Sequence, residues 1–439
     1  MTEAAAAAPR TVAVVGAGWA GLAASVALTQ QGHRVVLHEM APAAGGRARR
    51  LDGDGDRRAG LDNGQHIAIG AYRATLALLG TVGIDPGSVF LRTPLALVDA
   101  TGDGLLLGSG RTDLAFARAV LARRGWSWRE RFALLRAALG WQRGGFACPP
   151  ALTVEALVAG LPARVRAEVV EPLCVAALNT ASREASAAVF LRVLRDAFAE
   201  PGGADLLLPT VDLSTLVVEP ALVWLQARGA DVRFGSRVST LECVRHGDVG
   251  GWRVDGDAAD AVVLACTSTE AARLSAPHAP DWSRRAGAFE HEPIVTVYAT
   301  SEGARLPRPM LQLASDEATR PAQFVFDRGA IGGPAGLLAF VVSGARPWVE
   351  RGLEATERAV LAQGNSALSR WLGSPLTAVR TVVEKRATFR CVPGLDRPPT
   401  AIAAGLLAAG DYVAGPYPST LEGAIRSGVA AAQALADRR

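Results

Sequence analysis

The side chains best suited to chemistry lie together at residues 62–66, D-N-G-Q-H. His66 is the first candidate for a general acid, because an imidazole of ordinary pKa can be protonated near neutral pH and can then give that proton to a leaving group. Asp62 and Asp212 are weaker candidates for the same role. In the alternative interpretation, His66 and Gln65 only orient a bound group or a loop.

A G-x-G-x-x-G motif formed by Gly16, Gly18 and Gly21 could bind the pyrophosphate of a dinucleotide. The first glycine of such a motif makes a tight turn, the second lets the backbone approach the pyrophosphate at a helix N-terminus, and the third allows close packing of helix and strand. Glu39 lies 21 residues after Gly18. A carboxylate there accepts hydrogen bonds from ribose hydroxyls and repels a 2′-phosphate.

The flanking sequence predicts the elements that must position these residues. The β-branched run 11–15 is typical of a strand buried on both faces of a parallel sheet. Small and apolar residues recur at helical spacing over 19–31, and 34–38 forms a second strand that ends at Glu39. The stretch is therefore a βαβ unit, with the glycine motif and the acid in register.

Gly45-Gly46-Arg47 follows the acid and is not needed for an NAD site. The run from Gly16 through Glu39 to Arg47 resembles the FAD-binding N-terminus of the amine oxidase and phytoene desaturase superfamily. The resemblance implies that Arg47 lies against the FAD phosphates and that Gly45 and Gly46 let the chain pass beneath the flavin. An ordinary turn at the two glycines is the alternative.

The C-terminal region carries a second match. Residues 406–410 predict a strand, which Asp411 follows, and a helix comes next. Ser419 and Glu422 form an S-x-x-E capping box, which predicts the start of that helix. A C-terminal helix with only a structural role is the alternative.

In the superfamily this Gly-Asp pair and helix bind the flavin. The resemblance implies that Gly410-Asp411 binds it through Asp411 at the ribityl or pyrophosphate oxygens, and that the backbone at Thr420 and Leu421 meets the pyrimidine end of the isoalloxazine. A helix N-terminus offers N–H donors and partial positive charge to a reduced flavin. By the same resemblance the backbone at Val238 holds the adenine end.

These matches predict the domain organisation of the 439-residue chain. The fold class is α/β, a Rossmann-like FAD-binding domain of the GR2 type with an inserted α+β substrate domain. The FAD-binding domain is discontinuous and comprises residues 1–90, 228–275 and 395–439. The substrate-binding domain comprises residues 91–227 and 276–394.

The segment 62–66, followed by Gly70-Ala71-Tyr72, resembles one branch of the superfamily, the hydroxysqualene dehydroxylases. Further matches to that branch span nearly the whole chain, at 208–209, 212–214, 384–388 and 418–423. The resemblance implies that the segment, Gly64 included, runs beside the isoalloxazine. It also implies the reaction, in which the allylic C–OH of a thirty-carbon isoprenoid becomes C–H. This step completes the formation of squalene, from which hopanoids are made. His66 would protonate the leaving hydroxyl.

Three other interpretations share these motifs. Amine oxidases usually carry a lysine that holds a water at flavin N5, whereas Lys385 is the only lysine here and lies 26 residues before Asp411. Amine oxidases also often frame the substrate with a pair of aromatic residues. Such a pair is not excluded here, because Tyr412 and Tyr417 lie near the flavin helix. A carotenoid desaturase or isomerase shares the lipid substrate, but such chains are usually longer. A flavin-binding subunit without turnover is the non-enzymatic alternative.

Composition excludes several other classes. With 49% hydrophobic and 20% charged residues the chain is globular, and a net charge of +4 gives no sign of nucleic-acid binding. The five cysteines and six histidines lack disulfide or metal-ligand spacing, so we expect a cytoplasmic protein without a metal. Glycines interrupt the apolar run 11–28, so we expect no membrane-spanning helix. Only one dinucleotide motif is visible, which leaves the electron donor unidentified.

Residues 112–143 combine aromatic and aliphatic residues with seven arginines. Such a helical segment could lie on an anionic membrane, at the inner face of the cell membrane, and give a lipophilic substrate a way in. A solvated helix face over an ordinary core is the alternative. The arginines concerned are Arg118, Arg123, Arg124, Arg129, Arg131, Arg136 and Arg143.

Overall fold

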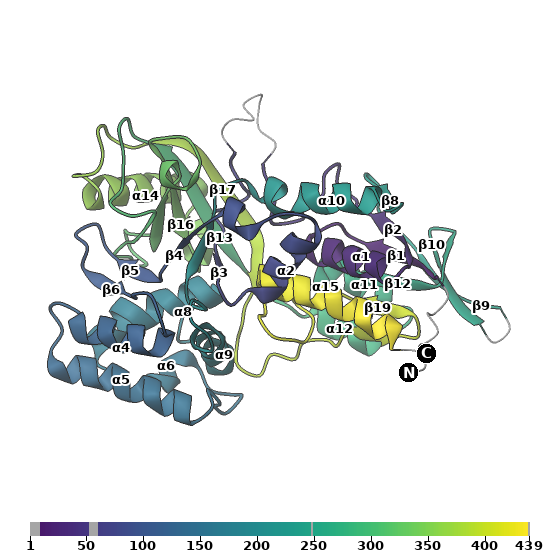
Figure 1. Cartoon of the computed structure of the whole chain (residues 1–439), viewed down its shortest axis with the longest axis horizontal. Helices are drawn as coiled ribbons and strands as arrows, with labels where there is room; N and C mark the ends of the chain where they lie inside the picture. Colours follow the sequence, from purple (N-terminus) through teal and green to yellow (C-terminus); the bar gives the residue numbers. More distant parts are fainter. Residues whose placement is uncertain (1–8, 52–59, 247–248, 438–439) are drawn as a thin grey trace.

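The protein has two lobes that lie side by side (Figure 1), as a computed structural model describes for residues 9–51, 60–246 and 249–437. One lobe is built on a mainly parallel sheet and carries both ends of the described chain. The other combines an antiparallel sheet with a group of helices. The chain crosses between the lobes several times, so neighbouring strands come from distant parts of the sequence.

The sheet of the first lobe has the strand order β18-β19-β12-β1-β2-β8. Its central strand β1 pairs in parallel with both β12 and β2, and only β18 runs antiparallel to its neighbour. This arrangement confirms the predicted α/β fold class. The strands are β1 (Thr11–Val15), β2 (Arg34–His38), β8 (Asp231–Arg233), β12 (Ala261–Leu264), β18 (Ala401–Ala403) and β19 (Leu406–Ala408).

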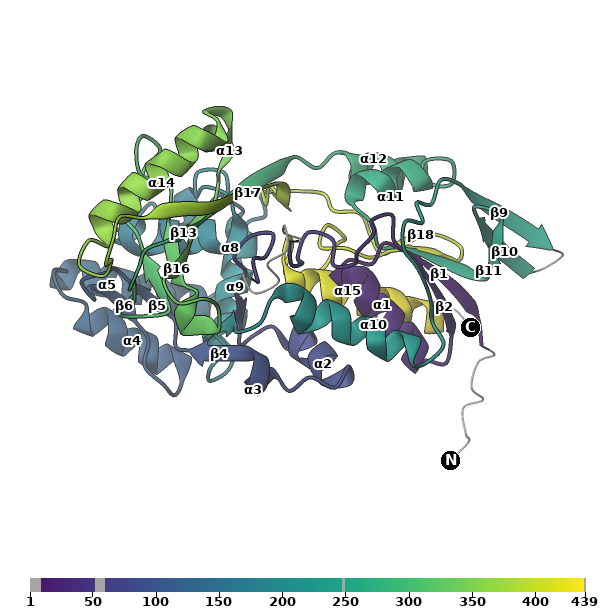
Figure 2. The ribbon, with the colours of Figure 1, turned by 90° about the horizontal axis from the view of Figure 1, so that it is seen from above.

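Three helices cover the sheet near the glycine motif. Helix α1 (Trp19–Gln30) follows β1 directly and packs against the C-terminal helix α15 (Leu421–Ala436) (Figure 2). Helix α10 (Glu219–Gln226), entered through a π-helical turn at Ser214–Val218, also contacts α1. Almost every residue of α1 is buried, because other elements cover it nearly all round.

Smaller elements complete this lobe and join it to the next. A meander of three strands and two helices extends from the parallel sheet, and a three-stranded sheet ordered β3-β7-β4 lies towards the other lobe. They are β9 (Leu241–His246), β10 (Val249–Val254), β11 (Asp257–Ala259), α11 (Ser268–Ser275), α12 (Pro280–Gly287), β3 (Ala68–Ile69), β4 (Phe90–Thr93), β7 (Leu206–Pro209), α2 (Arg73–Thr81) and α3 (Pro86–Val89).

The second lobe contains an antiparallel sheet ordered β14-β15-β16-β13-β17. Alternate residues of β16 enter two different cores, as the period of a strand requires: Leu338 and Phe340 pack on one face, Ala339 and Val341 on the other. Helices α13 (Arg346–Glu350) and α14 (Leu353–Ala367) cover the first face. The strands are β13 (His291–Thr300), β14 (Met310–Gln312), β15 (Phe324–Asp327), β16 (Leu337–Val342) and β17 (Thr377–Phe389).

The other face of this sheet looks towards the predominantly helical part, residues 112–200. The helical segment predicted at 112–143 is confirmed as two helices, and further helices continue to Phe198. The elements are α4 (Thr112–Ala122), α5 (Trp128–Arg143), α6 (Val154–Leu157), α7 (Ala163–Val165), a π-helical turn at Arg166–Val170, α8 (Glu171–Leu178) and α9 (Ala187–Phe198), with the hairpin β5 (Ala96–Val98) and β6 (Gly104–Leu106) beside them.

The predicted capping box at the start of α15 is wrong. Ser419 lies outside the helix with φ +56, and Thr420 is the N-cap, accepting a hydrogen bond from the Gly423 N–H. Glu422 is fully buried and does not cap its own helix. Its carboxylate instead accepts hydrogen bonds from two N–H groups in the first turn of α2 and forms an ion pair with Arg426 at 2.6 Å.

Candidate active site

A cavity of about 980 Å³ runs from the glycine motif through the contact between the lobes to α5 and α9. Its two ends differ in chemistry. Backbone, glycines and charged side chains line the end at the parallel sheet, whereas leucine, valine and phenylalanine dominate the other end. The cavity contains most of the residues that the sequence predicts for cofactor and substrate.

The glycine motif has the geometry that a pyrophosphate needs. A Cβ at Gly21 would lie 1.8 Å from the carbonyl oxygen of Gly16, so only glycine permits this approach of helix and strand. At Gly18 a Cβ would meet no protein atom within 4 Å, and no side chain caps the N-terminus of α1. The structure therefore leaves open space and free N–H donors where a phosphate group fits.

Glu39 lies at the end of β2 and lines the cavity. Its carboxylate accepts hydrogen bonds from the N–H groups of Ala17 and Ala41, both at 2.8 Å, which fix it beside the glycine motif. Val238 also lines this end and is buried, and its carbonyl accepts a hydrogen bond from Arg273.

Arg47 and Asp411, both predicted to meet the cofactor, contact each other. Their ion pair is 2.6 Å long, and the Asp411 carboxylate raises the pKa of the Arg47 guanidinium. Arg47 also donates to the carbonyls of Arg386 and Ala387, so it ties the segment after β2 to β17. Both side chains line the cavity.

The N-terminus of α15 faces the cavity beside this ion pair. Thr420 and Leu421 both line it, and within the described ranges the Leu421 N–H has no acceptor. The Gly410 N–H donates to Ser427 of α15, which holds the end of β19 against the helix. A group with partial negative charge would find a donor here.

The D-N-G-Q-H segment lines the middle of the cavity through all but its first residue. Gly64 has φ +98, a conformation that favours glycine, and its carbonyl lies 2.9 Å from Nδ1 of His66. Arg328 donates to Oε1 of Gln65. Asn63 donates to the Glu384 carboxylate at 2.9 Å, which joins the segment to β17.

The hydrogen bond to Gly64 determines how His66 titrates. A carbonyl can only accept, so Nδ1 carries a hydrogen in both charge states, and the titrating proton is on Nε2. Within the described ranges Nε2 has no partner. Burial lowers the pKa of His66, the hydrogen bond to the Gly64 carbonyl raises it by less, and the nearby Arg47 lowers it. The pKa of His66 therefore lies below the ordinary value assumed from the sequence, and the protonated form is scarcer at neutral pH than for an exposed imidazole.

The two carboxyl groups named as weaker acid candidates do not line the cavity. Asp62 is buried and accepts the Leu213 N–H, and burial raises its pKa to about 7. Asp212 accepts hydrogen bonds from Thr215 and Arg50, which outweigh its burial and hold its pKa below the usual value. Both carboxyl groups therefore lie outside the cavity lining, held by Leu213, Thr215 and Arg50, which favours His66 over them as the proton donor.

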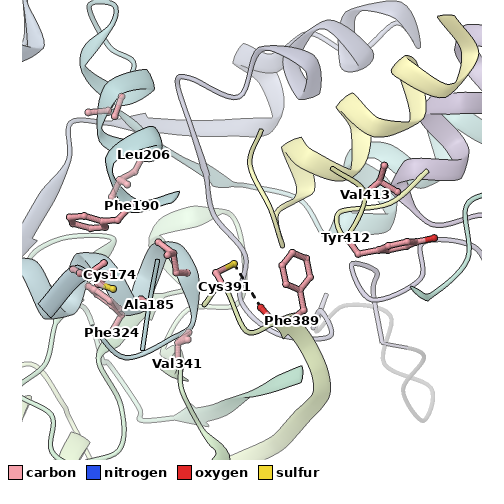
Figure 3. Packing of buried hydrophobic residues seen from close by; sticks show 14 of the residues in the cluster. Cys174, Ala185, Phe190, Leu206, Phe324, Val341, Phe389, Cys391, Tyr412 and Val413 are labelled. Carbon is pink, nitrogen blue, oxygen red and sulfur yellow. Dashed lines mark hydrogen bonds between the residues drawn. The ribbon is translucent and has the colours of Figure 1, made fainter. Parts of the chain in front are cut away.

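Buried apolar residues of both lobes meet around this cavity (Figure 3). Phe389 ends β17 and Cys391 follows it, while Tyr412 lies just after Asp411. The ring centroid of Phe289 lies 4.9 Å from that of Phe389 and 6.0 Å from that of Tyr412. Phe190 of α9 lies across from them. All five cysteines are free.

Comparison with known proteins decides the family. The family model described as flavin containing amine oxidoreductase matches residues 19–436. The chain belongs to this family. It is an oxidoreductase, and its cofactor is FAD.

Several relatives match this flavoprotein over nearly its full length. Hydroxysqualene dehydroxylases of Rhodopseudomonas palustris and Sinorhizobium fredii are each 28% identical, covering 96% and 97% of this chain and 97% and 98% of the relatives. A 15-cis-phytoene desaturase of Capsicum annuum is 24% identical over 97% of this chain and 78% of its own.

Solved structures share the fold at low identity. An oxidoreductase from Methanosarcina mazei has a TM-score of 0.71 at 15% identity, with 98% of this chain and 100% of that chain covered. Putrescine oxidase bound to putrescine has a TM-score of 0.64 at 19% identity, with 98% and 99% covered. These likenesses support the fold class.

Sequence reasoning missed several residues of the site. Tyr72 and Tyr417 form an edge-to-face pair with ring centroids 5.7 Å apart, and both line the cavity. The match at Gly70-Ala71-Tyr72 includes Tyr72, and the sequence places Tyr417 near the flavin helix, but no pattern in the sequence pairs the two rings. The buried Arg328 and the cavity-lining Glu384 had no spacing that could have assigned them to residues 62–66.

The position of the only lysine bears on the amine oxidase interpretation. Lys385 is exposed on β17 and does not line the cavity. A water held by a lysine inside the cavity, the usual arrangement in amine oxidases, therefore has no counterpart in this flavoprotein.

Proposed function

We propose that this flavoprotein is a hydroxysqualene dehydroxylase, which replaces the allylic hydroxyl of a thirty-carbon isoprenoid by hydrogen and so completes squalene for hopanoids. The observation that carries the proposal is the long apolar end of the cavity, which is continuous with the cofactor end. The full-length match to proteins of that name supports it. A polyamine would find few polar partners in such a cavity.

The apolar end suits a flexible hydrocarbon chain. Its walls come from α4, α5, α8, α9 and the inner face of the antiparallel sheet, and they are predominantly apolar. The lining residues include Leu97, Leu105, Phe116, Leu134, Leu135, Val169, Leu173, Phe190, Leu194, Phe198, Ile294, Phe324, Phe326 and Val341.

We assign the cofactor end to FAD as follows. The backbone at Gly16, Gly18 and Gly21 holds the pyrophosphate, and Glu39 accepts the adenosine ribose hydroxyls. Val238 holds the adenine end by its backbone. Gly46, Arg47, Gly410 and Asp411 lie along the phosphates and ribityl chain, while Gly64, Thr420 and Leu421 meet the isoalloxazine. Open space above Gly18 and the free Leu421 N–H support this assignment.

When bound in its reduced form at the cofactor end, FAD would supply the hydride for the new C–H bond. The chain must supply a proton, because hydroxide is a poor leaving group and departs as water. We assign this proton to Nε2 of His66, which has no partner among the described residues and belongs to a cavity-lining side chain. A lowered pKa makes the protonated imidazole a stronger acid, but a smaller fraction of the protein carries that proton at neutral pH.

Gln65 has a supporting role in this proposal. Its amide oxygen accepts from the buried Arg328, and its amide nitrogen donates to the His66 carbonyl. These two hydrogen bonds fix the backbone that carries the imidazole. As the C–O bond breaks, an allylic cation develops. The apolar walls keep water away from this cation, so that it takes up hydride instead of reacting with water.

A carotenoid desaturase is the second candidate, favoured by the match to a phytoene desaturase. Mass spectrometry of isoprenoids after anaerobic incubation distinguishes the two. The reduced holoenzyme should convert hydroxysqualene to squalene, whereas a desaturase would leave hydroxysqualene intact and, when oxidised, would remove hydrogen from phytoene.

We also propose that the enzyme works at the inner face of the cell membrane, where its substrate is dissolved. No helix within residues 9–51, 60–246 and 249–437 is long and apolar enough to cross a bilayer. The electron donor is a separate molecule in this proposal, since the sequence has one dinucleotide motif.

A further inference from the structure

Five large apolar side chains are exposed on α4 and α5, and we call this surface the hairpin face. On α5 the exposed fractions are 62% for Trp128, 59% for Phe132 and 44% for Leu139. Leu114 and Leu121 of α4 are exposed as well. Both helices lie at the outer edge of the second lobe in the two views (Figures 1 and 2). An exposed apolar surface of this kind marks an interaction site.

The aromatic residues of the hairpin face are held in place. Trp128 and Phe132 lie one helical turn apart and stack with ring centroids 5.8 Å apart. The guanidinium of Arg131 lies 4.7 Å from the Trp128 ring, and Arg131 donates to the carbonyl of Arg123. The rings are therefore presented to the surroundings in a fixed arrangement.

The charges around the hairpin face are positive and available. The acids of the two helices are occupied, because Glu130 closes the capping box with Ser127 and Asp113 pairs with Arg111. Five exposed arginines form no ion pair within the described ranges: Arg118, Arg124, Arg129, Arg136 and Arg143.

Arg123 must be removed from the set of arginines that the sequence assigned to a membrane. Its side chain is 6% exposed and pairs with Asp103 and Glu168. It joins the α4–α5 connection to the following helices, so its charge is not available to a lipid headgroup.

The cavity reaches the surface next to the hairpin face. Leu139 and Gln142 are exposed and also line the cavity, while Leu135, Ala138 and Trp141 line it from the inner side of α5. A single helix therefore presents one stripe to the surroundings and the adjacent stripe to the cavity. Leu139 and Gln142 mark where the cavity reaches the surface, and we call this rim of the cavity the portal.

We infer that the hairpin face lies on an anionic lipid bilayer and that the isoprenoid passes from the bilayer into the cavity through the portal. Apolar rings enter the acyl boundary while arginines meet phosphate headgroups, which is how interfacial helices bind. The identity of the cargo rests on the proposed function, but docking does not. The direct route spares a nearly insoluble chain any exposure to water.

Vesicle binding tests the docking. FAD-loaded full-length protein should co-sediment with vesicles of phosphatidylcholine and phosphatidylglycerol, and more weakly with phosphatidylcholine alone. Arg129→Glu with Arg136→Glu should reduce binding at least about tenfold, because each basic residue near such a surface contributes roughly 1 kcal/mol. Arg370→Glu with Arg380→Glu, two exposed arginines elsewhere, is the charge-matched control and should bind like wild type.

A second pair of variants tests the apolar contribution. Trp128→Ser with Phe132→Ser should weaken vesicle binding, whereas Val223→Ser with Val379→Ser, also exposed, should not. Equal loss in both arginine variants, or unchanged binding in the hairpin variants, overturns the docking surface. Binding to a protein partner but not to vesicles overturns the lipid assignment.

Turnover separates this inference from the proposed function. The Trp128→Ser, Phe132→Ser variant should consume hydroxysqualene supplied in detergent like wild type but consume it more slowly from vesicles. Equal rates from vesicles overturn the portal route. Wild-type protein that binds vesicles but never consumes hydroxysqualene overturns the proposed function and leaves the docking standing.

Discussion

The two ends of the cavity are built on different principles. At the cofactor end, the lining consists of backbone groups, glycines and one ion pair, and the glycines and Glu39 follow a recognisable spacing in the sequence. At the substrate end, the walls are apolar side chains from helices and strands that lie far apart in the chain. A phosphate needs donors at defined points, whereas a hydrocarbon needs only shape and dryness.

Because the two ends differ in this way, substitutions at each end should change different properties of the protein. Substitutions at the cofactor end should act through single atoms and affect FAD retention. The substrate end should tolerate conservative exchanges of apolar residues, because dispersion is spread over many contacts. His66, the proposed proton donor, lines the cavity between the two ends, so its loss should have the largest effect on turnover.

Removing the imidazole should have the largest effect. His66→Ala should keep FAD and lose about 10²- to 10⁴-fold in the single-turnover oxidation of pre-reduced protein by hydroxysqualene, because a general acid contributes about that much. His66→Gln should do little better, since it supplies no proton. His278→Ala, a histidine remote from the cavity, is the control. Near wild-type rates in both His66 variants would leave His66 as a positioning residue.

A methyl group at Gly18, next to the proposed pyrophosphate position, should lower FAD affinity without lowering the stability of the FAD-free protein. Gly18→Ala places a Cβ where no protein atom lies within 4 Å, so the protein without FAD should melt like wild type. FAD affinity should fall by roughly 1–3 kcal/mol, the usual cost of overpacking. Gly80→Ala, with equal free space on α2, should retain FAD. Unchanged FAD affinity in Gly18→Ala would place the pyrophosphate elsewhere.

The pH dependence of the single-turnover rate should report the protonation of His66, which lies between the two ends of the cavity. Burial lowers the pKa of His66 from 6.5, and the acid must be protonated to act. The single-turnover rate should therefore fall as pH rises above that pKa, by up to about tenfold per unit, and level off below it. His66→Gln should lose this dependence. A rate that rises with pH would require a base instead.

The smallest effect is expected at Asp212. Its carboxylate binds Arg50 and Thr215 outside the cavity, so Asp212→Asn should lower stability while leaving turnover close to wild type at a temperature where the variant is folded. Thermal melting and single-turnover kinetics on one preparation measure both. A large loss of turnover in the folded variant would return Asp212 to the list of acid candidates.

Much of the cofactor end could be predicted from the sequence. Strands 11–15 and 34–38 lie where the pattern places them, and the predicted helix 19–31 differs by a single residue from Trp19–Gln30. Local periodicity and glycine spacing determine these elements. The parallel fold class follows from them.

Long-range contacts could not be predicted. The spacing of Ser419 and Glu422 suits a capping box, but Glu422 serves α2, some 350 residues earlier in the chain. The pKa of His66 depends on burial between two lobes, which no local pattern contains. Asp62 belongs to the D-N-G-Q-H motif, whose residue types suggest catalysis, yet its carboxylate accepts a hydrogen bond from the Leu213 N–H, 151 residues later in the chain.

Deuterium transfer tests the central claim most directly. Pre-reduced holoenzyme is equilibrated in oxygen-free D₂O, where the transferable flavin hydrogen exchanges with solvent, and is then mixed with hydroxysqualene. The account predicts that flavin absorbance returns in step with squalene and that each squalene carries one deuterium on carbon. Flavin that stays reduced, or squalene without deuterium, would contradict it.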